Sequence, residues 1–101
     1  MKKVDCLIEL KLYNCNLDSN WARELADNLQ GSYKDLEILH VRENKINALG
    51  LTFLCSAFSN ENICRIKELD IRDNDLKDSC HKVLFSLLYK NRHIENIRYR
   101  V

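Results

Sequence analysis

The chain has 101 residues, enough for one domain with a modest core and too few for two. Hydrophobic residues at 46% and charged residues at 31% are typical of folded proteins, and a net charge of +1 gives no global attraction to nucleic acid or to a membrane. Five cysteines, with no C-x-x-C pair, argue against a secreted disulfide framework and against a zinc site. We therefore expect a cytoplasmic protein with reduced thiols, no metal and no cofactor.

One pattern of apolar residues occurs three times along the chain, starting near residues 7, 36 and 66, and begins a fourth time at 94. Each full copy has Leu, Ile or Val at its first, fourth and sixth positions, Cys or Asn at the ninth and Leu or Ile at the eleventh. The pattern predicts a short strand in each copy. The strand residues that we expect to be almost fully buried are Leu10, Leu12, Leu39, Val41, Leu69 and Ile71.

Apolar residues with helical spacing follow each strand pattern. These faces are Ala22, Leu25, Ala26 and Leu29; then Leu51, Leu54, Cys55 and Phe58; then His81, Leu84, Phe85 and Leu88. For the first helix the candidate caps are Asp18, Ser19 and Asn20; for the second, Asn47; and for the third, Asp78 and Ser79. Each unit is thus predicted to be a strand, a turn and a returning helix, and stacked units would bury one another's apolar faces.

The ninth position of the pattern falls where each strand ends and the chain bends. A side-chain amide at Asn44 and Asn74 can satisfy backbone groups that lose their ladder partners there. Cys15 fills the same position in the first copy. We expect both asparagines to be buried, and we expect Asn60 and Asn91 to be exposed.

This spacing resembles the ribonuclease-inhibitor-like leucine-rich repeats over nearly the whole chain, and the segments 54–66 and 69–76 are similar to the C-terminal repeats of NOD-like receptors. The resemblance implies an α/β right-handed solenoid, a horseshoe segment formed by residues 1–101, with parallel strands on the concave face and helices on the convex face. Gly50 fits a glycine position of the family, whereas Trp21 and Cys80 stand at the equivalent places and His81 takes an apolar position.

Enzymatic signatures are weak. Cys80 and His81 are adjacent, but neighbouring helix residues point about 100° apart, so they do not suit a nucleophile and its base. The sequence has no glycine-rich phosphate loop, no G-x-S-x-G and no H-E-x-x-H. We therefore expect no enzyme.

Two columns of outward-pointing strand residues are the candidate contact surface. The fifth pattern positions are Lys11, His40, Asp70 and Arg98, and the seventh positions are Tyr13, Arg42, Arg72 and Arg100. Two interpretations of the arginines stay open. They are neutralised by neighbouring acids in a surface ion network of little net stability, or they receive carboxylates or phosphates of a partner, with Tyr13 as an aromatic anchor.

We expect a protein–protein interaction module that binds a protein partner through the concave strand face. The alternative is a structural or assembly piece that packs against further repeats or another copy of itself. The edge from Val4 to Leu12 has little cover, which predicts self-association there or upstream repeats, whereas the basic C-terminal end is better protected. No membrane partner is expected, because no apolar run is long enough to span a bilayer. Nucleic acid is an unlikely partner, because the arginine stripe is short, interleaved with acids and lacks stacking aromatics.

Overall fold

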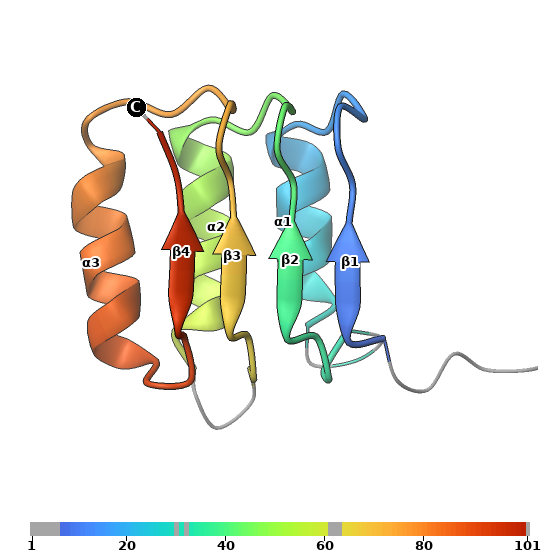
Figure 1. Ribbon diagram of the computed structural model, residues 1–101, viewed down its shortest axis with the longest axis vertical. Helices are drawn as coiled ribbons and strands as arrows, with labels where there is room; N and C mark the ends of the chain where they lie inside the picture. Colours follow the sequence, from blue (N-terminus) through green and yellow to red (C-terminus); the bar gives the residue numbers. More distant parts are fainter. Residues whose placement is uncertain (1–6, 30, 32, 61–63, 101) are drawn as a thin grey trace, which may run out of the picture.

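Strands and helices alternate along the chain in the computed structural model, which describes residues 7–29, 31, 33–60 and 64–100. The strands are β1 (Glu9–Lys11), β2 (Ile38–His40), β3 (Glu68–Asp70) and β4 (Asn96–Arg98), and the helices are α1 (Ser19–Asp27), α2 (Ala48–Phe58) and α3 (Cys80–Lys90). All strand pairs are parallel, in the order β1-β2-β3-β4. Figure 1 shows the strands side by side with the helices on one face. The parallel pairing agrees with what the resemblance to leucine-rich repeats implies, and the strand order follows the order along the chain.

The core lies between the sheet and the helices. Leu39, Leu69 and their neighbours Val41 and Ile71 are at most 1% exposed, as predicted. The prediction for Leu10 and Leu12 is wrong, because both are only partly buried. Among the described residues β1 has a neighbouring strand on one side only, so its apolar side chains receive less cover than those of the inner strands.

Side-chain caps begin the first two helices where the sequence predicted them. The Asp18 carboxylate accepts hydrogen bonds from the backbone N–H groups of Asn20 and Trp21, at 3.0 and 3.1 Å. The Asn47 side chain does the same at the start of α2. At α3 neither expected cap acts through its side chain. Ser79 is the N-cap residue without a side-chain hydrogen bond, and the Asp78 carbonyl accepts from the backbone of His81.

The helix faces agree with the prediction on α2 and differ on α3. The predicted face of α2, from Leu51 to Phe58, is buried. On α3, however, Phe85 is 63% exposed and Leu88 is 43% exposed, and the buried residues are Cys80, Leu84 and Leu87. Since α3 is the last helix of the described row, it packs against α2, and no described helix lies on its other side.

The asparagine at the ninth position bridges neighbouring units. The Asn44 Oδ1 accepts from the backbone N–H groups of Cys15 and Leu17, at 2.9 and 3.0 Å, and its Nδ2 donates to the Leu12 carbonyl at 2.8 Å. Asn74 makes the equivalent link, accepting from the N–H of Ile46 at 3.0 Å.

Asn91 lies outside the repeating position and was predicted to be exposed, which is wrong. Its side chain is 0% exposed, and its Nδ2 donates to the Phe58 carbonyl at 2.6 Å. Its Oδ1 accepts from the backbone N–H of His93 at 2.9 Å. Asn91 thus links the end of α3 to the end of α2 by a hydrogen bond. No local pattern in the sequence predicts this contact between units.

None of the helices in the described part of the chain has the length and apolar composition needed to cross a bilayer.

Candidate functional site

The side of the sheet away from the helices carries the residues that the sequence singled out. Because Leu10, Leu39 and Leu69 turn toward the helices, the residues on either side of them turn away. The register places the fifth-position column in one row across the strands. The seventh-position column follows just beyond the strand ends, where the Arg42 and Arg72 carbonyls accept from Asn14 and Glu43. We call this surface the strand face; its predicted members are Lys11, Tyr13, His40, Arg42, Asp70, Arg72, Arg98 and Arg100.

A chain of polar contacts crosses the strand face through His40. The Tyr13 hydroxyl lies 3.1 Å from the His40 Nδ1, and the His40 Nε2 lies 2.6 Å from the Glu68 carboxylate. The other Glu68 oxygen accepts from the Asn96 amide at 3.4 Å. The hydrogen bond from His40 is the main reason why the pKa of Glu68 lies below its ordinary value. These contacts join Tyr13, which follows β1, to side chains of β2, β3 and β4.

Arg72 and Asp70, which the pattern predicts to point outward, form a closed ion pair, as expected if neighbouring acids neutralise the arginines. The Arg72 guanidinium donates twice to the Asp70 carboxylate, at 2.7 and 3.0 Å, and the Arg72 backbone N–H donates to it as well. Asp70 is only 2% exposed, and Arg72 is half-buried over it. Burial raises the pKa of Asp70, but the hydrogen bonds from Arg72 outweigh burial and hold that pKa below its ordinary value. Asp70 is therefore a support for Arg72 and has little surface of its own to offer.

Arg42 and Arg100 share one counter-ion. Their guanidinium groups reach the Asp73 carboxylate at 3.4 and 3.1 Å, from opposite sides of the intervening Arg72 position. The Arg42 side chain is 33% exposed and the Arg100 side chain 58%. The Arg42 Nε is buried and has no hydrogen-bond partner among the described residues, so only the outer nitrogens of this guanidinium can reach a partner. Arg42 also lines a hollow of about 240 Å³ with Tyr13 and Glu43. These two arginines keep donor capacity that Arg72 has lost to Asp70.

The remaining predicted members of the strand face lie at its rim. Lys11 is exposed and 3.9 Å from the Glu9 carboxylate, a distance at which an exposed ion pair contributes little to stability. Arg98 is exposed, and its charge lowers the pKa of Glu68 as a secondary cause behind the hydrogen bond from His40. The structure thus brings the predicted residues onto one side of the sheet, as a closed ion pair, a bridging network, two arginines that share Asp73 and two residues at the rim.

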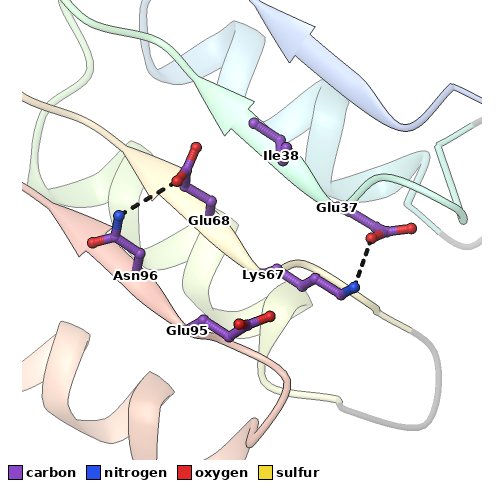
Figure 2. Close-up of a pocket in the computed structure, with 6 residues that line it drawn as sticks. All are labelled: Glu37, Ile38, Lys67, Glu68, Glu95 and Asn96. Carbon is purple, nitrogen blue, oxygen red and sulfur yellow. Dashed lines mark hydrogen bonds and ion pairs between the residues drawn. The ribbon is translucent and has the colours of Figure 1, made fainter.

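A second hollow, which the sequence analysis missed, lies at the opposite end of the strands. It measures about 400 Å³ and is lined by Glu37, Ile38, Lys67, Glu68, Glu95 and Asn96. Figure 2 shows Lys67 reaching across to Glu37, where the ammonium and carboxylate groups lie 3.0 Å apart. The second pattern positions, Glu37, Lys67 and Glu95, recur at the same spacing as the two predicted columns and could have revealed this hollow. Three carboxylates and one ammonium group line this hollow, so this end of the strand face is acidic, whereas the other end pairs its arginines with acids.

The three buried cysteines, Cys55, Cys64 and Cys80, are poor candidates for a reactive thiolate. Burial raises the pKa of Cys55 to about 12 and also raises the pKa values of Cys64 and Cys80. His81, next to Cys80 in the sequence, has its Nδ1 2.9 Å from the Tyr99 hydroxyl instead. No group of His, Cys, Asp or Glu among the described residues has the arrangement of a metal site.

No protein-family model matches the chain. The chain is similar to FERM domain-containing protein C of Dictyostelium discoideum, with 28% identity over 91 residues. The matched region covers 90% of this chain and 6% of that protein, so the chain spans a small part of the relative's length.

Proposed function

We propose that the chain is a leucine-rich-repeat segment of the ribonuclease-inhibitor-like type, whose strand face binds a protein partner. The repeat assignment is supported by one strand per unit at near-constant spacing, parallel pairing in chain order, and an asparagine amide that links each turn to the unit before it. Such units build a right-handed solenoid with the strands on its concave face. We also propose a cytoplasmic location, since Cys15, Cys55, Cys64 and Cys80 are free thiols.

The observation that carries the function is the sharing of Asp73 by Arg42 and Arg100. One carboxylate satisfies two guanidinium groups at long distances, so both arginines retain donors for a partner's carboxylate. The adjacent hollow beside Tyr13 gives room for the partner's side chain next to an aromatic ring. Arg72 supports the surface through Asp70 and does not contact the partner through its paired donors.

The acidic hollow at the other end of the strands could receive a basic group of the partner, whereas Arg42 and Arg100 could receive an acidic one. A partner that presents an acidic group to Arg42 and Arg100 and a basic group to Glu95 and Glu37 would match the polarity of the whole strand face. Surfaces of this kind select partners by charge and speed their encounter, with binding that weakens as salt rises.

Affinity capture with the purified chain, followed by binding measurements with the purified captured protein, tests this function. Replacing Arg42 and Arg100 with Glu should weaken binding at least ten-fold and remove most of its salt dependence, while the melting temperature changes little. A matched control replaces Arg23 and Arg65 with Glu, because both are exposed and lie off the strand face. Equal binding by the two double variants would place the interface elsewhere.

A further inference from the structure

The C-terminal end of the row of units has an uncovered apolar face. Phe85 and Leu88 of α3 occupy the positions held by Cys55 and Phe58 in α2. In α2, which has a helix on either side, those positions are 3% and 0% exposed, whereas Phe85 and Leu88 are 63% and 43% exposed. We call Phe85 and Leu88 the α3 face. The comparison of α2 with α3 indicates that residues at these two positions become buried when a neighbouring unit packs against them.

Aromatic contacts connect the α3 face to the last strand. The His81 ring stacks near Phe85 at a centroid distance of 6.4 Å and meets the Tyr99 ring edge-on at 5.4 Å. Residues 80–100 contain five Lys or Arg and a single acid, Glu95, so this end of the chain is basic overall. The end thus combines an exposed apolar surface with an excess of basic residues.

The N-terminal end has a hollow on the outer side of α1. Ser19 of α1 contacts Asn47 beside α2, and Trp21 lies about 200° further round the helix, on the side turned away from α2. On that side Trp21, Glu24, Leu25, Asn28 and Tyr33 line a hollow of about 110 Å³, which we call the α1 hollow. Residues 1–36 contain six acids and five bases, so this end is nearly neutral and does not repel the basic end.

The two sheet edges also match. The Arg98 carbonyl accepts from the Ile71 N–H at 2.9 Å, so the alternation of the strand turns the backbone groups of Ile97 and Tyr99 toward the other edge. On β1 the Leu12 N–H donates to the His40 carbonyl at 2.8 Å, which turns the backbone groups of Lys11 toward the opposite edge of the sheet. A parallel ladder between β4 and a second β1 would use groups that are unused within the described sheet.

We propose that the chain associates head to tail with a second copy, with β4 beside β1 of the next molecule and the α3 face against its α1 hollow. In Figure 1, α3 stands beyond β4 at one end of the row and β1 stands at the other, so the next copy continues the same alternation. The interface joins two different surfaces, so it does not close on itself and produces open chains. This association is independent of partner binding by the strand face.

Two variants with one blocked end each provide the decisive experiment. Sedimentation velocity of the wild-type chain at rising concentration should show continued growth beyond a dimer. Phe85→Asp blocks the α3 face and Glu24→Arg blocks the α1 hollow, so each variant alone should stay monomeric. Mixed together, they should form a one-to-one dimer that does not grow, because one intact interface remains. Ser86→Asp, on another exposed side of α3, should associate like wild type.

A gain-of-association variant sharpens the test. In the register of the sheet Lys11 of the next copy would lie beside Arg98, whereas within the chain the residue beside Arg98 is Asp70. Lys11→Glu should therefore tighten association by roughly five-fold at low salt. Arg42→Glu, which weakens partner binding, should leave association unchanged. Circular dichroism should first show that the variants are folded. The proposal would then be overturned by a wild-type chain or a mixture that stays monomeric. It would also be overturned by a Phe85→Asp variant that still dimerises.

Discussion

Removing the Asn44 amide is the sharpest perturbation of the fold, because its contacts can be followed one by one. In Asn44→Ala the Val41 carbonyl keeps the Asn74 amide at 2.9 Å, and the Arg42 carbonyl keeps the Asn14 N–H at 3.2 Å. The Leu17 N–H and the Leu12 carbonyl lose the Asn44 amide, which bonded to them at 3.0 and 2.8 Å.

Those two losses set the size of the effect. Each stranded, partly buried backbone group costs about 1–1.5 kcal/mol, so the variant should lose about 2–3 kcal/mol of unfolding free energy. The N–H of Cys15 adds little, because that residue is exposed and water can replace the amide oxygen. For a domain of this size the loss corresponds to a fall in melting temperature of about 10–20 °C.

Urea unfolding followed by circular dichroism measures this loss, and Asn60→Ala is the matched control. Asn60 is exposed, so its replacement should change stability by less than about 0.5 kcal/mol. Asn91→Ala should cost at least as much as Asn44→Ala, because the Asn91 side chain is fully buried between two units. A loss at Asn44 no greater than that at Asn60 would refute the reasoning.

Three further outcomes are expected. Gly50→Ala should lower the unfolding free energy by about 1–3 kcal/mol in the same urea assay, because the added Cβ would stand 2.7 Å from the Ser19 Oγ and 3.0 Å from its Cα. Glu43→Gly should raise stability by up to about 1 kcal/mol, since Glu43 holds a left-handed φ of 58°; an unchanged or lower midpoint would contradict this. The pKa of Asp70 is lowered in the folded state, so the ionised carboxylate stabilises the fold at pH values above its ordinary pKa of 3.8. This stabilisation is lost as the pH falls through the folded-state pKa. The stability difference between wild type and Asp70→Asn should therefore shrink between about pH 6 and about pH 3.

The repeating features of the fold were predictable because each rests on a local rule that recurs. The apolar spacing of Leu39 and Leu69 fixes which side of each strand is buried, and the parallel register aligns them. The amide position at Asn44 and Asn74 follows from the need to satisfy turn backbone groups.

The burial of a few residues differs from the prediction because it depends on contacts with neighbouring units, which the apolar spacing within one unit does not reveal. Leu10 and Phe85 have the right spacing for burial but stand at the two ends of the row, where cover is partial or missing. Asn91 is buried by contacts with Phe58 and Cys64, far away in the sequence.

For the strand face, the sequence placed the residues together but did not decide how the charges pair. Arg42, Arg72 and Arg100 are equivalent in the pattern, yet one is closed on a buried carboxylate and two share an exposed one. The difference comes from Asp70, which replaces His40 at the fifth position of the third unit and lies two residues before Arg72. A single change between units thus decides which arginine is available.

The bridging amides also give the molecule internal reporters of its motion. The N–H groups of Leu17 and Ile46 lie outside every helix and strand, yet each donates to an asparagine of the following unit. Each of these two hydrogens can exchange with solvent only when the asparagine side chain that accepts it moves away. This movement does not require a helix to fray. Exchange at Leu17 therefore measures separation of the first unit from the second, and exchange at Ile46 measures separation of the second from the third.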